Sequence, residues 1–270
     1  MSKGFVWIAQ NNSTTDYMSL SVALANNIKS VCKINNVCII TDNKTKVPKG
    51  VFDHVKILDE DIAVEDENKF SNEYKVFKLS PFTHTIKLEA DLVLPKNIDW
   101  WWNFLCQHDQ VFSYHCRDYQ DNVITDSPYR RLNHQNSLPD VYNGLHYFRY
   151  SRRAAEFYDI CECITKNWNY VRENILKNCH EKRPTTDTVY ALANKIQDPL
   201  QQHSVRYEWF NFIHGKSNIQ QSLPKNTELY NYMSPYIVND AVYLGGNRIN
   251  RIWHYCEPKN ILEELNVRIS

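Results

Sequence analysis

The sequence predicts an α/β fold built around buried parallel strands, and three consecutive segments near the N-terminus carry that prediction. Residues 5–9 are apolar on both faces, which is typical of a strand that helices cover on both sides. Residues 16–29 follow a polar loop with several possible helix caps and place apolar side chains near one helix face. A second apolar run, residues 36–41, completes the strand–helix–strand order of a right-handed crossover unit.

The expected ligand pocket follows from this topology. Ligands of such sheets bind beyond the C-terminal ends of the strands. The first strand runs into a polar loop at residues 9–12, and the second strand ends at Asp42. We therefore expect this loop and Asp42 to border a nucleotide pocket.

The rest of the chain alternates apolar runs with polar connections. Residues 59–68 are rich in acids and predict a solvated loop, and residues 117–139 predict a long polar loop of the kind that is usually functional or disordered. Further strands are expected at residues 52–58, 85–88, 110–116, 140–150, 207–214, 241–244 and 252–255, and helices at residues 72–79, 95–105, 151–167 and 184–193.

Composition limits the class of protein. The 270 residues are 43% hydrophobic, which suits one large domain, and no apolar run approaches the roughly 20 residues that span a bilayer. The N-terminus runs directly into a strand, so we expect no signal peptide, no membrane segment and a cytoplasmic location. Eight cysteines without framework spacing predict reduced thiols. A formal net charge of zero argues against a general polyanion binder.

Two carboxylates at the end of one apolar strand are the strongest chemical signal. Glu89 and Asp91 follow the run at residues 85–88 and are separated by the small Ala90. In an extended chain, residues i and i+2 point to the same side, and two acids aimed at one point repel unless a positive charge lies between them. Mn²⁺ or Mg²⁺ suits such oxygen ligands. The alternative is a solvated turn or a helix cap, because an acidic pair at this spacing is common.

The segment from Ser80 to Leu94 resembles the metal-binding segment of nucleotide-sugar glycosyltransferases of the GT-A fold, especially the glycogenin-like group (family eight type). Those enzymes carry a D-x-D motif after an SPF or SPY sequence and a strand, and Glu89 stands here in place of the first Asp. The resemblance covers residues 5 to 259 and implies a Rossmann-like α/β fold with a mixed central sheet flanked by helices. It implies one glycosyltransferase domain, residues 1–270, with a nucleotide-binding half at about 1–95 and an acceptor half at about 96–270.

The resemblance also assigns residues to the donor site. Ala9, Asn11 and Tyr17 match the opening pattern of the family and would line the uridine site, although Tyr17 could instead pack on a helix face. A basic residue just upstream of the metal strand reaches the donor in the family. Lys75 is the candidate for it, and the alternative is an exposed helical lysine.

Two later segments match the part of the family that surrounds the transferred sugar. Asn143 and Gly144 open a strand at which the family places an amide against the donor sugar, and glycine there allows close backbone approach. The family's Ser between them is absent. Asp187 matches an Asp near the sugar and the acceptor, and it also fits a helix cap, since Thr185-Thr186-Asp187 precedes an apolar run.

The C-terminal strand completes the implied site. Residues 252–255 resemble a family ending in which a His is the third metal ligand and a Lys contacts the donor diphosphate. His254 and Lys259 hold those positions. The family's Gly between them and its Trp after the Pro are absent, and a lone His is usually structural.

The implied function is a metal-dependent glycosyltransferase that moves a sugar from a nucleotide sugar, a UDP-sugar, to a hydroxyl with retention of anomeric configuration. Glu89, Asp91 and His254 would hold Mn²⁺ or Mg²⁺, and the cation and Lys259 would stabilise the departing diphosphate. Asn143 and Asp187 would act at the reacting sugar.

Two observations suggest the acceptor. The chain is rich in Asn and Lys and resembles phage cytoplasmic enzymes in style. Within the family, tailed phages encode glycosyltransferases that modify hydroxymethylated bases in their own DNA. The leading expectation is hydroxymethylated cytosine in double-stranded phage DNA, with the base flipped out of the duplex. The alternatives are a glycan or protein acceptor, or a domain that binds a nucleotide sugar without transfer. The basic acceptor face would comprise the loop at residues 117–135 with Arg149, Arg152, Arg153, Lys216, Arg248 and Arg251.

Overall fold

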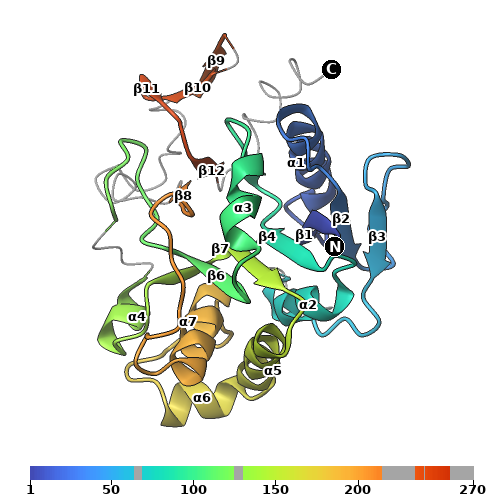
Figure 1. Cartoon of the computed structure of the whole chain (residues 1–270). Helices are drawn as coiled ribbons and strands as arrows, with labels where there is room; N and C mark the ends of the chain where they lie inside the picture. The colour runs from blue at the N-terminus through green and yellow to red at the C-terminus, as the bar shows by residue number, and fades with distance from the viewer. Residues whose placement is uncertain (64–68, 125–129, 215–234, 240, 256–270) are drawn as a thin grey trace.

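The computed structural model describes residues 1–63, 69–124, 130–214, 235–239 and 241–255. A six-stranded sheet forms its centre (Figure 1). Four neighbouring strands are parallel, and the last two alternate in direction, so the sheet is mixed as expected. In spatial order the strands are β3 (His54–Ile57), β2 (Val37–Thr41), β1 (Lys3–Ile8), β4 (His84–Leu88), β7 (Val141–Arg149) and β6 (Gln110–Tyr114).

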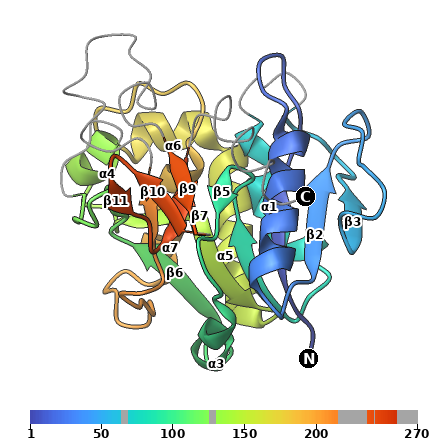
Figure 2. The ribbon, with the colours of Figure 1, turned by 90° about the horizontal axis from the view of Figure 1, so that it is seen from above.

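Alternate residues of β1 show why this sheet lies between two helical layers. Phe5 and Trp7 belong to a core that includes the apolar face of α1 (Tyr17–Val31). Val6 and Ile8 point the other way, into the core with α5 (Arg152–Lys166) and α7 (Thr186–Gln197). Side chains of a strand alternate between its faces, so a strand that is apolar throughout needs cover on both sides. Figure 2 shows α1 on one side of the sheet and α5 on the other.

The edge strand β3 departs from this pattern. Among the described residues it pairs with β2 alone, in parallel, and all four of its side chains are exposed. Val55 and Ile57 therefore lie at the surface, 46% and 50% exposed. A strand at residues 52–58 is found at the expected place, shortened to its central residues.

A small second sheet joins the end of the chain to its middle. Its strands are β5 (Leu92–Val93), β12 (Ile252–His254) and β8 (Phe212–His214), with β12 antiparallel to β5 and parallel to β8. Because β12 pairs with β5, it lies beside the segment that directly follows Glu89 and Asp91. The third sheet comprises β9 (Tyr236–Val238), β10 (Ala241–Leu244) and β11 (Asn247–Arg248).

Two expected helices are shorter and tighter than the sequence pattern indicates, and the long polar loop contains a helix. Residues 72–79 form a 3₁₀ helix followed by one turn of α-helix. Residues 95–105 likewise contain a short 3₁₀ helix followed by one turn of α-helix. α6 (Trp168–Asn174) follows α5 directly. The elements concerned are η1 (Phe70–Lys75), α2 (Val76–Leu79), η2 (Asp99–Trp101), α3 (Trp102–Leu105) and α4 (Arg131–Gln135).

Two further features concern the cysteines and the length of the helices. Seven cysteines lie in the described part of the chain, and all seven are free, as expected of reduced thiols. Among the described residues, every helix is too short or too polar to cross a bilayer.

Asn27 is a polar tie between α1 and the segment after β5. Its side chain is buried, donates to the backbone carbonyl of Leu94 at 3.1 Å and accepts from the Leu94 amide at 2.8 Å. We expect Asn27→Ala to lower the free energy of unfolding by about 2 kcal/mol or more, because two buried backbone groups lose their partner. Urea unfolding measures this effect. Asn26→Ala is the control, and an equal loss in both variants would contradict the assigned role.

Candidate metal and donor site

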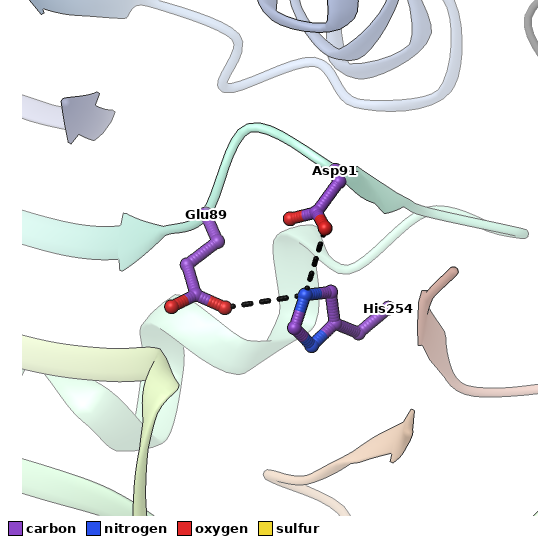
Figure 3. Close-up of side chains that lie close together, drawn as sticks. All are labelled: Glu89, Asp91 and His254. Carbon is purple, nitrogen blue, oxygen red and sulfur yellow. Dashed lines mark ion pairs between the residues drawn. The ribbon is translucent and has the colours of Figure 1, made fainter. Parts of the chain in front are cut away.

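Three side chains from two distant parts of the sequence converge on one point. Glu89, Asp91 and His254 each offer a ligand atom, and these atoms all lie within 4.8 Å of one another. His254 Nε2 is 3.3 Å from Glu89 Oε2 and 3.0 Å from Asp91 Oδ2 (Figure 3). Two carboxylates and an imidazole with this spacing can hold a divalent cation.

Strand pairing explains how His254 reaches the acids. β4 is buried at every position and ends at Leu88, so the chain turns there and delivers Glu89 at the end of the sheet. Leu92 then pairs with His254 across β5 and β12, and the amide of Tyr255 donates to the carbonyl of Asp91 at 3.2 Å. The antiparallel register therefore fixes the histidine beside the residue that precedes β5.

The electrostatics of the triad favour a bound cation. Burial raises the pKa of Glu89, and His254 works against that shift. The pKa of Tyr17 is also raised, first by burial and then by the charges of Asp91 and Glu89. A divalent cation between the carboxylates would lower the pKa of Glu89 and relieve the repulsion.

Asn143 lies behind the triad and is fully buried. Its side-chain amide donates to Glu89 Oε1 at 2.8 Å, and its Oδ1 accepts from the ammonium of Lys87 at 2.8 Å. The Lys87 ammonium lies 3.0 Å from Glu73 Oε2 and is itself fully buried. The amide of Asn143 thus orients Glu89, while the implied role against a donor sugar stays a prediction.

Gly144 brings the backbone of β7 close to Glu89. A Cβ at this position would lie 3.1 Å from Glu89 Oε2 and 3.2 Å from the ring of Phe212. Any larger residue would push on the carboxylate, so the chain keeps glycine where β7 passes behind Glu89.

Asp187 is held in the first turn of α7 by a buried arginine. Thr185, not Asp187, caps this helix, with its side chain accepting from the amide of Thr188. Asp187 Oδ1 accepts from the backbone amide of Asn143 at 2.7 Å, and Oδ2 lies 3.4 Å from Arg130. The position of Asp187 is therefore fixed by Asn143 and Arg130, and Asp187 is not the cap of this helix.

These groups surround one cavity of about 200 Å³ at the C-terminal ends of the parallel strands. Six of the residues that the sequence singles out line it, and five of the six carry polar side chains. The full lining comprises Ile8, Gln10, Tyr17, Lys69, Glu73, Glu89, Ala90, Asp91, Tyr142, Gly144, Thr185, Thr186, Asp187, Phe212, His214 and His254.

The remaining sequence candidates lie elsewhere. Ala9 is buried in the core next to α1. Asn11 accepts from the Met18 amide in the first turn of α1 at 2.9 Å, while Asp16 is the cap of that helix. Lys75 donates to the carbonyl of Glu60 instead of facing the cavity. Lys259 lies outside the described residues.

A second, wider cavity adjoins the first. It has a volume of about 620 Å³ and shares Lys69 with the triad cavity. Asn11 and Asp42 line it, so the loop after β1 and the end of β2 do border a pocket, as the crossover topology predicts. Asp42 fixes this wall by accepting from the amides of Lys44 and Thr45 at 2.9 and 2.7 Å.

The sequence did not assign four residues to this site. Glu73 and His214 line the cavity, and Lys87 and Arg130 are buried beneath it. Lys87 carried a signal, since a lysine inside an apolar strand needs an acidic partner. The sequence places Arg130 on a basic acceptor face, and the structure corrects this, because its side chain is 3% exposed.

No protein-family model matches the sequence, and no curated protein sequence matches it. Solved structures do match. The galactosyltransferase LgtC, in complex with donor and acceptor sugar analogues, aligns over 98% of this chain and 95% of its own with a TM-score of 0.56 at 10% identity. The chain has the fold of GT-A glycosyltransferases. Mouse xyloside xylosyltransferase 1 aligns over 93% of this chain and 96% of its own, with a TM-score of 0.50 at 10% identity. GlyE of Streptococcus pneumoniae TIGR4 aligns over 96% of this chain and 56% of its own, with a TM-score of 0.51 at 10% identity.

Replacing Arg130 tests whether it is a buried structural cation. Arg130 lies 3.0 Å from Asp140 and 3.4 Å from Asp187, and its guanidinium lies 4.1 Å from the centre of the Tyr142 ring. We expect Arg130→Met to lower the free energy of unfolding by about 3–5 kcal/mol, because two partly buried carboxylates lose their counter-charge. The neighbouring Arg131 is exposed, so Arg131→Met should have little effect in the same urea experiment. A stable Arg130→Met protein would contradict the assignment.

Removing the imidazole tests the metal site directly. We expect His254→Ala to weaken Mn²⁺ binding by about 10-fold to 100-fold or more, since even residues one shell away from a metal contribute that much. Calorimetric titration with MnCl₂ measures the affinity, and His134→Ala, on an exposed position of α4, is the control. Equal affinities for wild type and His254→Ala would exclude His254 as a ligand.

Proposed function

We propose that this protein is a metal-dependent glycosyltransferase that moves a sugar from a nucleotide sugar, a UDP-sugar, to a hydroxyl acceptor. The observation that carries the proposal is the convergence of Glu89, Asp91 and His254 on one point in a cavity of a GT-A fold. Nucleotide ligands of open α/β sheets bind at this edge, beyond the strand ends. LgtC, which shares the fold, was solved in complex with donor and acceptor sugar analogues, and this supports a fold of this kind acting on sugars.

The residues have separable roles in this proposal. A bound Mn²⁺ or Mg²⁺ ion would offset the charge of the departing diphosphate. The chain holds the ligands by packing Asn143 against Glu89 and by pairing β12 with β5. The wider cavity beside Asn11 and Asp42 offers space for the nucleoside, and Tyr17 lines the neighbouring cavity together with the carboxylates. Asp187 lines the triad cavity, and there it would orient a hydroxyl of the sugar or the acceptor in a transfer that retains anomeric configuration.

Ion pairs within the chain bear on the choice of acceptor. Several basic side chains of the expected DNA-binding face are engaged by neighbouring acids: Arg149 lies 2.6 Å from Asp109, and Arg152 lies 2.8 Å from Glu156. Arg251 is paired with Asp121. These pairs lower the positive potential available to phosphates, so hydroxymethylcytosine in DNA stays one arm of the test beside glycan and protein acceptors.

We expect wild-type protein to release UDP from at least one UDP-sugar in the presence of Mn²⁺, and Asp91→Asn to reduce the rate by about 100-fold or more. The change keeps the size of the side chain but removes the charge that would hold the cation. UDP release is measured over a panel of donors, with and without DNA containing hydroxymethylcytosine.

Comparing UDP release with and without this DNA separates the possible acceptors. Release that DNA stimulates supports the DNA acceptor, and release that is indifferent to DNA directs the search to glycans and proteins. Binding of UDP-sugars by wild type without any release would favour a domain that binds nucleotide sugars without transfer. No binding of any donor would refute the proposed function.

A further inference from the structure

Glu73 is an acidic side chain in the cavity that the metal site does not use. It belongs to η1, in the segment before β4, and it lines the same cavity as the triad. Its side chain is 14% exposed. A carboxylate at a cavity wall with so little contact to water needs a positive charge or hydrogen-bond donors to stabilise it.

The partner is Lys87. Glu73 Oε2 lies 3.0 Å from the Lys87 ammonium, which is fully buried and also donates to the side chain and carbonyl of Asn143 at 2.8 and 3.0 Å. A buried cation with three oxygen neighbours is fixed in place, so the Glu73 carboxylate that it holds is fixed as well. The lysine cannot touch a ligand itself, because no part of it is exposed.

The charge of Glu73 indicates which part of a donor it faces. A diphosphate beside a carboxylate would be repelled, so the phosphates belong at the cation site of Glu89, Asp91 and His254. The nucleoside has its own space in the wider cavity. The neutral, hydroxyl-rich sugar is the part of a nucleotide sugar that a carboxylate can hold, since hydroxyl groups donate strong hydrogen bonds to ionised acceptors.

The neighbouring wall agrees with this assignment. Thr185, Thr186 and Asp187 line the same cavity and add further hydroxyl and carboxylate oxygens. A wall of acceptor oxygens matches the surface of a sugar better than that of a phosphate.

We propose that Glu73, anchored by Lys87, accepts hydrogen bonds from hydroxyl groups of the transferred sugar and sets the specificity for that sugar. The inference rests on the proposed function, because it assigns the part of the nucleotide sugar that this wall binds. It differs from the sequence expectation for this segment, in which the basic Lys75 reaches the donor.

The test compares the affinity for UDP with the affinity for UDP-sugars. Glu73→Gln keeps an oxygen for Lys87 but replaces the second acceptor with an NH₂ group. We expect this variant to weaken binding of the preferred UDP-sugar by about 10-fold to 100-fold and to leave binding of UDP with Mn²⁺ unchanged, since only the sugar loses a charged hydrogen bond. The panel comprises UDP-glucose, UDP-galactose, UDP-N-acetylglucosamine and UDP-xylose, measured by calorimetry with Mn²⁺ present. Glu156→Gln, on the solvent face of α5, is the matched control.

A second measurement identifies the contacted hydroxyl. Deoxy versions of the preferred UDP-sugar are titrated against both proteins, and the analogue that lacks the contacted hydroxyl should bind wild type and Glu73→Gln equally well. Unfolding midpoints of the two proteins are compared to show that the fold is intact.

The outcomes separate this inference from the proposed function. The role of Glu73 would be overturned if wild-type protein bound UDP and every UDP-sugar with the same affinity. It would also be overturned if Glu73→Gln bound every UDP-sugar as tightly as wild type does. Either result would leave the metal and nucleotide site in place. Equal losses for UDP and UDP-sugar would place Glu73 at the metal or nucleotide and also overturn it. Wild-type protein that binds neither UDP nor any UDP-sugar would refute both.

Discussion

Several acidic side chains line one partly buried cavity, and the other residues of the site are arranged to offset the repulsion among them. Two buried cations offset part of it: Lys87 lies against Glu73, and Arg130 lies against Asp187. Charged groups removed from water are costly unless they are paired and hydrogen-bonded, and both cations have several oxygen partners. The fold therefore places these buried cations beneath the cavity, where they hold carboxylates in place without reaching a ligand.

The triad differs from these pairs in an instructive way. Glu89 and Asp91 both approach the same nitrogen of His254, at 3.3 and 3.0 Å. An imidazole carries at most one positive charge and cannot balance two carboxylates, and burial already raises the pKa of Glu89. A divalent cation at the point where these three side chains meet would stabilise both carboxylates and accept the imidazole as a ligand, which is the physical basis for assigning the metal site here.

Much of this arrangement could be predicted from the sequence, for identifiable reasons. Strands β1 and β2 are apolar at nearly every position, so their burial follows from composition, and the helix between them predicts their parallel pairing. Glu89 and Asp91 stand out because they follow the buried strand β4 and are separated by one small residue. The position of His254 beside them depends on the pairing of β12 with β5, which no local pattern encodes and which the resemblance to a family supplied.

The residues that the sequence did not indicate owe their positions to geometry that local patterns miss. The pattern of the segment before β4 predicts an α-helix, but the segment forms the 3₁₀ helix η1, with about 3.0 residues per turn. Residues two apart point to different sides of an α-helix and of a 3₁₀ helix, so Glu73 and Lys75 cannot both face the cavity. In the fold, Lys75 turns to Glu60, and Glu73 stays at the wall beside the buried Lys87, a tertiary contact that no local pattern shows. A carboxylate at that wall repels phosphate and accepts hydrogen bonds from hydroxyl groups, so this contact decides which part of a donor the wall can bind.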